Sequence, residues 1–449
     1  MSSIATRLME QRVPRYTSYP TAPHFHAGIS EDVYRRWLAE LPDETALSLY
    51  VHIPFCDTLC WFCGCTTLVA NRYGPVAAYL DALDREMDGV RTSLGRERAV
   101  THIHFGGGSP TLLEPADIER VGGWLRHRFG PSAGAELAIE VDPRGLDDRR
   151  VAAMGAIGLT RASIGLQDFN PRVQEAINRI QSEEETASAV ARLRAVGVTS
   201  VNLDLVYGLP YQSTADVLHT VEAALALEPD RLALFGYAHV PHLKRHQRLI
   251  PTESLPGAEA RLEQADAAEA RLRAAGYVRI GLDHFAKASD PMAVALREGR
   301  LKRNFQGYTT DVAPALIGFG ASAIGALPQG YVQNTADVRA YMRQAGEGRL
   351  PVLKGIALSP GDRVRRAIIE QLMCALTVDV AATAAAAGVA PATLLDAFDR
   401  LRPLEADGLV AVDGWRVTVP EAARQLVRLA AAAFDAYLNP DEGRHSLAV

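Results

Sequence analysis

The feature that most constrains the fold is a regular alternation of two kinds of segment between about residues 47 and 285. Short apolar runs rich in β-branched residues alternate with longer segments whose apolar residues recur every three or four positions. The first pattern is typical of buried strands and the second of amphipathic helices. Their alternation predicts parallel βαβ units, which fit either a doubly wound sheet or an incomplete barrel. Six strands are expected, at 46–52, 100–105, 136–141, 161–166, 200–206 and 231–237.

Residues with distinctive chemistry come at or just after the ends of these strands. In chain order they are a cysteine cluster, Gly106–Gly108, Glu140, Gln167, Asp204, Tyr237 and Ala238. Functional sites of parallel α/β folds gather at the carboxyl ends of the strands. We therefore expect these residues to share one rim, which favours the barrel-like arrangement.

The sequence changes character after about residue 300. From Pro360 the chain is rich in Ala and Leu with helical periodicity, and 409–419 is typical of a hairpin with an Asp-Gly turn. Helices followed by a small hairpin resemble a winged-helix module, but no basic stripe accompanies them, so a structural cap is favoured over DNA binding. We expect three parts: an N-terminal extension (1–45), a partial barrel (46–290) and a mainly helical, winged-helix-like C-terminal domain (291–449).

Composition indicates an ordinary globular protein, with 48% hydrophobic and 22% charged residues. The net charge of −6 argues against a generally nucleic-acid-binding surface. No apolar run reaches the roughly 18 residues that a membrane span needs, and the first residues lack the apolar core of a signal peptide. We expect a cytoplasmic protein without a membrane partner. Cys374, within an apolar run, is expected to be a buried small hydrophobe.

Four of the five cysteines lie within ten residues, as Cys56, Cys60, Cys63 and Cys65. A structural zinc site would normally combine two ligand pairs from separate segments, and no second pair lies at a suitable spacing. A redox pair at Cys60 and Cys63 would leave the other two cysteines without a role. A [4Fe–4S] cluster can be held by thiolates from one tight loop. Three thiolates would leave the fourth iron open for a small chelating ligand.

The spacing CxxxCxxC after a first strand, with the aromatic Phe62 before the last cysteine, resembles the radical S-adenosylmethionine (SAM) superfamily. GGGSP at 106–110 resembles the second motif of that superfamily, whose glycines let the backbone approach the methionine amino group. The resemblance implies that the open iron chelates the amino and carboxylate groups of SAM. It also implies that an electron from the cluster cleaves the sulfonium to give a 5′-deoxyadenosyl radical.

Further blocks resemble the oxygen-independent coproporphyrinogen III dehydrogenase family, from residue 14 to at least 325. They are PRYTSYPTA (14–22), IEVDPR (139–144), GLQDFNPRVQ (165–174), NLDLVYGLP (202–210), YAHVP (237–241), GLDHFA (281–286) and RNFQGYTT (303–310). The resemblance implies a partial (β/α)6 radical SAM barrel that carries two SAM molecules. It implies conversion of two propionates of coproporphyrinogen III to vinyls, giving protoporphyrinogen IX in haem synthesis. The electron donor would be a protein such as flavodoxin or ferredoxin. We separately expect the protein to be a monomer.

The resemblance also assigns residues, position by position. Cys56, Cys60 and Cys63 would be the iron ligands, and Cys65 is not expected to ligate. The cluster-bound SAM would meet Tyr50, Gly107 and Glu140. The second SAM would be lined by Phe62, Gly108, Ser109, Gln167, Arg179, Asp204 and Ala238, and Ile324 would pack against an adenine. No side chain is assigned a catalytic role, because the radical derived from SAM would carry out the chemistry.

Five cations are candidates for the propionate carboxylates of the substrate: Arg15, Lys244, Arg245, Arg248 and Arg303. For any one of them a solvated surface charge is the more ordinary explanation.

Two alternatives differ in function. A related haem chaperone shares the cysteine triad, but it usually has Phe where this chain has Cys65 and lacks the block at 14–22. It would bind haem stoichiometrically. A regulatory iron–sulfur protein using the C-terminal module would bind duplex DNA in a salt-sensitive manner, and the acidic net charge counts against it.

Overall fold

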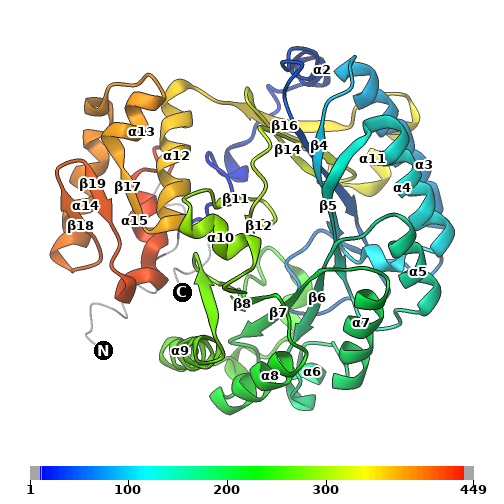
Figure 1. Cartoon of the computed structure of the whole chain (residues 1–449), viewed down its shortest axis with the longest axis horizontal. Coiled ribbons are helices and arrows are strands. Elements are labelled where there is room, and N and C mark those ends of the chain that lie inside the picture. Colours follow the sequence, from blue (N-terminus) through cyan, green and yellow to red (C-terminus); the bar gives the residue numbers. More distant parts are fainter. Residues whose placement is uncertain (1–10, 12, 439–449) are drawn as a thin grey trace.

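A twelve-stranded sheet organises the molecule (Figure 1). The computed structural model describes residue 11 and residues 13–438; the parts of the expected extension and C-terminal domain at 1–10, 12 and 439–449 lie outside the described residues. Six neighbouring strands run parallel and match the six expected ones. They are β1 (Leu47–Ile53), β4 (Val100–Gly107), β5 (Pro131–Val141), β6 (Arg161–Gln167), β7 (Ser200–Tyr207) and β8 (Arg231–Gly236). The barrel-like α/β fold is confirmed.

The strand β6 shows why the sheet curls around a polar interior. Ala162, Ile164 and Leu166 are fully buried, whereas the alternate residues of the strand are only partly buried. Successive side chains of a strand point to opposite faces. One face of β6 therefore packs beneath the helices, and the other faces a lumen.

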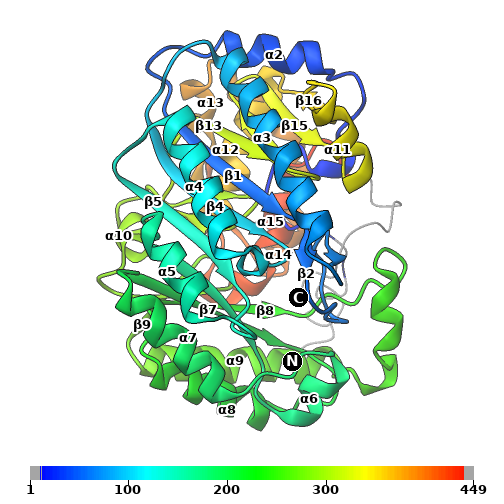
Figure 2. The same ribbon diagram turned by 90° about the vertical axis from the view of Figure 1, so that its right-hand side faces the viewer.

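Helices cover the outer face of the parallel strands (Figure 2). They are α3 (Gly74–Leu94), α4 (Pro115–Phe129), α5 (Asp148–Ala156), α6 (Pro171–Ala176), α7 (Glu183–Ala195), α8 (Thr214–Ala226) and α9 (Ala258–Ala274). Several begin at residues that suit a helix start: Ser182 and Ser213 each form a capping box with the acidic residue three positions later. These caps end the loops at the rim and fix where each helix starts.

The sheet extends past residue 290, the boundary expected from the sequence. The strand β13 (Ala315–Phe319) pairs in parallel with β1 on the side opposite β4. Antiparallel strands then complete both edges: β14 (Ile324–Leu327), β15 (Gly330–Asn334) and β16 (Val352–Ala357) on one side, and β10 (His284–Lys287) and β9 (Tyr277–Ile280) on the other. The same region contributes α10 (Pro291–Arg297), α11 (Val338–Gly346) and a hairpin of β11 (Lys302–Asn304) and β12 (Gly307–Thr309).

A separate helical module follows, drawn in orange and red in Figure 1. It contains α12 (Pro360–Ala375), β17 (Thr377–Asp379), α13 (Val380–Ala386), α14 (Leu395–Ala406), β18 (Ala411–Asp413), β19 (Arg416–Thr418) and α15 (Val427–Ala433). The strands β18 and β19 form the expected hairpin, and Gly414 in its turn has a φ of 58°. Three short strands with helices around them give the winged-helix-like form that the sequence predicts.

The N-terminal segment binds this C-terminal module. Val13, Tyr16 and Tyr19 are buried in the same apolar core as α12 and α15. The hydroxyl of Tyr16 donates a hydrogen bond of 3.0 Å to Asp435. The chain then crosses to the sheet, where His26 pairs with Gly355 at β16 and α2 (Glu31–Ala39) packs on α3. The two ends of the described chain are therefore joined in one core.

Candidate functional site

The cysteine loop follows β1 at the carboxyl end of the sheet. A short strand β2 (Phe55–Cys56) pairs in parallel with β3 (Leu68–Val69), and this pairing closes the loop between them. Cys60 is buried, Cys56 and Cys63 are half-buried, and Cys65 is exposed. The linker after α6 fixes one flank of the loop, because the amide of Trp61 donates to the Ile177 carbonyl over 2.9 Å.

The opposite flank of the loop is held by the segment after β8, which includes the 3₁₀ turn η3 (Arg245–Leu249). Lys244 Nζ donates to the Cys65 carbonyl over 2.9 Å, and Gln247 Nε2 donates to the Phe62 carbonyl over 3.0 Å. His246 Nε2 lies 2.7 Å from the Cys63 carbonyl, which can only accept. Three side chains thus fix three carbonyls around the last cysteines.

Two guanidinium groups approach the buried thiol of Cys60. Arg144 Nη2 lies 3.5 Å from Cys60 Sγ, and Arg179 Nη1 lies 3.6 Å from it. Both arginines also bond to Asp142. Nearby cations stabilise a thiolate, which is the form that binds metal.

The pKa values of the flanking thiols diverge. A hydrogen bond with Cys65 lowers the pKa of Cys63 to about 6, while burial raises that of Cys56 to about 11. Thr67 donates to Cys56 Sγ over 3.2 Å, which partly offsets that burial.

The donor set of the loop fits an iron–sulfur cluster. Among the described residues, no three His, Cys, Asp or Glu side chains converge as the ligands of one metal ion would. A cluster takes one thiolate on each of several irons, so its ligands need not meet at a point. Three thiols from one loop, with two guanidinium groups beside the buried one, meet this requirement.

The glycines at the end of β4 allow very close packing. Gly107 has a φ of 119°, and a Cβ on it would come within 2.8 Å of the His52 ring and 2.9 Å of the Ile53 carbonyl oxygen. A Cβ on Gly108 would come within 2.6 Å of the Phe55 carbonyl oxygen. Only glycine fits at these two positions. The end of β4 therefore lies directly against the end of β1 and the start of the cysteine loop.

Tyr50, His104 and Glu140 lie together beneath these glycines. The Tyr50 ring stacks on His104 with centroids 5.9 Å apart at 22°. The amide of Gly107 donates to Glu140 Oε2 over 3.1 Å. Because His52 Nε2 donates to the Thr66 carbonyl, its Nδ1 accepts from the Tyr50 hydroxyl over 2.9 Å. Ile324 is close by, since Gly318 is the partner of Tyr50 in β13, and a Cβ added to Gly318 would come within 2.9 Å of the Ile324 backbone.

The residues expected around a second SAM lie on the neighbouring strand ends. Arg179 Nη2 donates to the Gly165 carbonyl over 2.7 Å, while Arg179 Nε is buried without a partner among the described residues. Asp204 accepts from Ser163 over 3.0 Å and from Asn202 over 2.8 Å, and burial raises its pKa.

Three further residues of this set also lie at the rim. Gln167 ends β6 with a φ of 69°, Ser109 Oγ lies 2.9 Å from Thr111 Oγ1, and the Ala238 carbonyl accepts from Gln247 over 3.2 Å.

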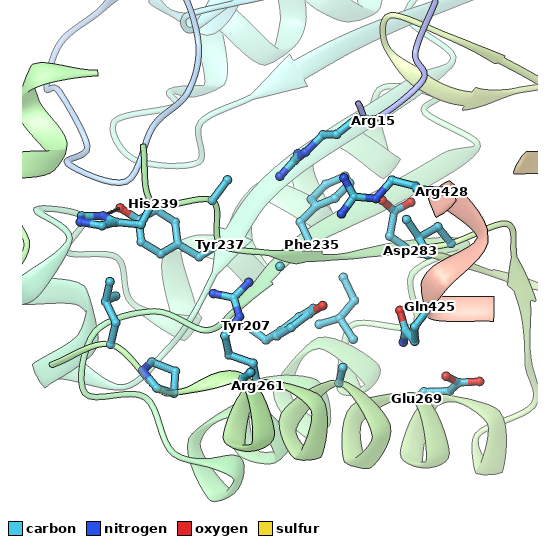
Figure 3. Close-up of a pocket in the computed structure, with 18 of the residues that line it drawn as sticks. Arg15, Tyr207, Phe235, Tyr237, His239, Arg261, Glu269, Asp283, Gln425 and Arg428 are labelled. Atoms are coloured by element: carbon cyan, nitrogen blue, oxygen red, sulfur yellow. Dashed lines mark hydrogen bonds between the residues drawn. The ribbon is translucent and has the colours of Figure 1, made fainter. Parts of the chain in front are cut away.

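Two cavities adjoin this rim. The smaller, of about 170 Å³, occupies the lumen and is lined by His104, Glu140 and Asp204 together with the β11–β12 hairpin. The larger, of about 400 Å³, lies beyond β8 and extends to Gly236 and Ala238 at the end of that strand. Figure 3 shows Arg261 reaching into it from α9, with Arg15 and Arg428 approaching from the other side.

The larger cavity is basic and aromatic. Arg15, Arg261, Arg303 and Arg428 line it with Tyr207, Phe235 and Tyr237. Two of its carboxylates have cationic neighbours of their own. Glu269 pairs with Arg279, and Asp283 bonds His284 over 2.7 Å.

The acidic and basic groups of this cavity perturb one another. Although burial raises the pKa of Asp283, His284 and the charges of Arg303 and Arg15 lower it to about 2. Burial and the charge of Arg15 lower the pKa of Arg428 to about 10. Burial, with Arg15 nearby, also lowers the pKa of Arg261, which has no carboxylate partner among the described residues.

The structure therefore separates the five cations considered for the substrate. Arg15 and Arg303 line the basic cavity, whereas Lys244, Arg245 and Arg248 do not. Sequence reasoning missed Arg261, because α9 carries many charged residues and nothing in the sequence distinguishes this arginine from the others. It also missed Arg428, although a lone cation in the apolar run QLVRLAAAAF was a usable signal.

Cys374 is buried as expected, at 4% exposure. No helix in the described part of the chain combines the length and apolar character that crossing a bilayer requires.

Comparison with known proteins identifies the family of the chain. The family model of the radical SAM superfamily matches residues 50–224, and that of the HemN C-terminal domain matches residues 358–426. The oxygen-independent coproporphyrinogen III oxidase of Bradyrhizobium diazoefficiens is 50% identical over 448 residues, covering 100% of both chains. That of Salmonella typhimurium is 41% identical, covering 95% of this chain and 93% of its own.

A solved structure gives the same result. The coproporphyrinogen III oxidase (HemN) of Escherichia coli, described as a radical SAM enzyme, superposes with a TM-score of 0.90 at 39% identity. The match covers 95% of this chain and 100% of that one. The chain belongs to the oxygen-independent coproporphyrinogen III oxidase family of radical SAM enzymes.

Proposed function

We propose that the protein converts two propionate side chains of coproporphyrinogen III to vinyl groups, giving protoporphyrinogen IX. One observation carries the proposal: a basic, aromatic cavity of about 400 Å³ reaches the same rim as the cysteine loop. A porphyrinogen with four propionates needs apolar walls for its pyrroles and cations for its carboxylates, and this cavity offers both.

Cys56, Cys60 and Cys63 would hold a [4Fe–4S] cluster. When bound, the cluster and SAM together supply a 5′-deoxyadenosyl radical that takes a hydrogen atom from a propionate. Arg144 and Arg179 would stabilise the thiolate of Cys60, to which both already donate. Cys65 would keep its place in the loop without ligating, since its amide donates to Cys63 Sγ over 3.3 Å.

The remaining rim residues would bind and orient SAM. The glycine backbone at 107 and the ring of Tyr50 would contact the first SAM, and Glu140 would accept from its ribose hydroxyls. Ile324 would pack against its adenine. The second SAM would be lined by Phe62, Gly108, Ser109, Gln167, Arg179, Asp204 and Ala238. The unpartnered Arg179 Nε supports this assignment, because a buried N–H without an acceptor is costly until a ligand carboxylate meets it.

Four of the five arginines that line the larger cavity, Arg15, Arg261, Arg303 and Arg428, would fix the substrate by its carboxylates, while the fifth, Arg279, pairs with Glu269. Arg261 is the strongest candidate, because it has no carboxylate partner among the described residues. Its Cζ lies 5.7 Å from the centroid of the Tyr207 ring. We also infer that the protein acts as a monomer in the cytoplasm and takes its electron from a flavodoxin or ferredoxin.

An anaerobic assay tests the proposal. The reconstituted protein would receive dithionite, SAM and coproporphyrinogen III, and the products would be oxidised and separated. We expect protoporphyrin and 5′-deoxyadenosine from the wild type, and neither from Cys60→Ser. Deoxyadenosine without protoporphyrin would overturn the substrate while keeping the radical chemistry. Stoichiometric haem binding in that case would identify a chaperone instead.

A further inference from the structure

The segment that fixes the cysteine loop also presents an unusual surface. Arg245, Arg248 and His242 are exposed there, and residues 231–252 contain no Asp or Glu in a chain whose net charge is −6. Arg245 and Arg248 make no ion pair in the described structure and do not line the basic cavity. The role proposed for the protein above leaves these charges without a use.

Exposed apolar side chains gather around the same loop. Of the nine large hydrophobic residues exposed in the described part of the chain, five lie in the loop's own strands or in segments bonded to it: Leu68, Val69, Ile180, Leu243 and Leu249. Leu243 and Leu249 are 63% and 56% exposed. Leu243 and Leu249 lie close to Arg245 and Arg248 in the chain, and exposed apolar residues bordered by charge mark interaction sites more often than inert surface.

This surface lies directly over the cysteines. Figure 2 shows the segment after β8, in green at the right-hand side, beside the loop that follows β2. Lys244, His246 and Gln247 bond the carbonyls of Cys65, Cys63 and Phe62. A protein docked on this segment would therefore bind beside the cysteine loop. Residues 237–240 of this segment line the basic cavity, whereas residues 241–252, which carry the exposed cations and leucines, do not.

We propose that this surface docks an acidic one-electron carrier protein, with Arg245 and Arg248 meeting its carboxylates and the exposed leucines packing at the centre. The inference rests on the proposed function, because it assumes a cluster in the loop. The carrier loses one electron and the oxidised cluster gains it, which supplies the electron that SAM cleavage consumes. An acidic partner fits because residues 231–252 expose Arg245 and Arg248 and contain no Asp or Glu.

The experiment compares protein-borne with small-molecule electrons. The double variant Arg245→Glu and Arg248→Glu would be reconstituted beside the wild type, and cluster reduction would be followed by anaerobic stopped-flow absorbance. The matched control is Arg36→Glu with Arg96→Glu. It makes the same change in net charge with exposed arginines that precede β1 and β4, at the opposite end of the sheet.

With reduced flavodoxin as the probe, we expect the second-order rate constant of the R245E/R248E variant to fall at least tenfold at low salt. Its salt dependence should flatten, because electrostatic steering raises association rates by about 10- to 1,000-fold. Flavodoxin binding measured by calorimetry should weaken in parallel. Reduction by dithionite should be unchanged, and the control variant should resemble the wild type in every measurement.

An unchanged flavodoxin rate and affinity in R245E/R248E would overturn the docking surface while leaving the proposed function intact. An equal loss in the control would also overturn it, because net charge rather than this surface would then govern association. If dithionite reduces no cluster in the wild type, the assignment of the cluster fails, and the docking inference fails with it.

Discussion

Replacing Arg261 by Gln should weaken substrate binding while making the protein more stable. Burial lowers the pKa of this guanidinium, so its charge is costly in the ligand-free protein, and no carboxylate among the described residues offsets that cost. A bound propionate would supply the missing partner. A hydrogen bond to a charged group contributes about 1.5–3 kcal/mol, which corresponds to an affinity about 10- to 150-fold lower without it.

The assay is fluorescence titration with coproporphyrin III, the air-stable macrocycle that carries the same four propionates. Arg271→Gln is the matched control, because Arg271 lies on the same helix but pairs with Glu222 and does not line the cavity. We expect Arg261→Gln to raise the melting temperature and the dissociation constant together, and Arg261→Lys to recover part of the affinity. Wild-type affinity in Arg261→Gln would refute the carboxylate role. A lower melting temperature would show that the charge is already compensated.

Three further predictions concern the loop, the rim and the core. Cys60→Ser should abolish iron binding after reconstitution, measured as iron per chain, whereas Cys374→Ser, in a buried and unreactive position, should retain it. Glu140→Gln should weaken SAM binding about tenfold or more by equilibrium dialysis with the cluster spectrum unchanged, because an amide accepts less strongly from ribose hydroxyls. Burial raises the pKa of Glu86 from 4.5 to about 7. The protonated carboxyl of Glu86 therefore contributes fully to the free energy of unfolding below pH 4.5. This contribution is lost as the pH rises through 7. Denaturant unfolding should show the wild type losing about 3 kcal/mol relative to Glu86→Gln between about pH 4.5 and 8.

The parallel core of the fold was predictable because each of its strands carries its own local signal. In β6, for example, Ala162, Ile164 and Leu166 alternate with less buried residues in a run that a helix would not show. The strand β13 was not foreseen. Its five residues pair with β1 across more than 260 positions. The glycine-rich stretch around it shows neither the two-residue alternation of a strand nor the three- to four-residue repeat of a helix. Long-range pairing of this kind leaves no mark in a local window.

The site was predictable to a similar extent. The cysteine spacing and the glycines at 106–108 indicate the rim, because close backbone approach and the proposed thiolate ligation restrict which residues can stand there. The basic cavity as a whole could not be foreseen, although Arg15 and Arg303 were among the expected substrate-binding cations. Its arginines come from the N-terminal segment, α9, β9, β11 and α15, and only the packing of these five elements brings Arg15, Arg261, Arg279, Arg303 and Arg428 together.

The joining of the two chain ends has a consequence for synthesis on the ribosome. Tyr16 and Asp435 are 419 residues apart, and the core that they share also positions Arg15 and Arg428 beside the cavity. The cysteine loop, by contrast, is made from residues that leave the ribosome early. Its cysteines can therefore be present in a nascent chain long before the carboxylate-binding wall exists, since domains generally form in order from the N-terminus. A truncated or unfinished chain would carry the cysteine loop proposed to hold the cluster without the arginines proposed to bind the substrate.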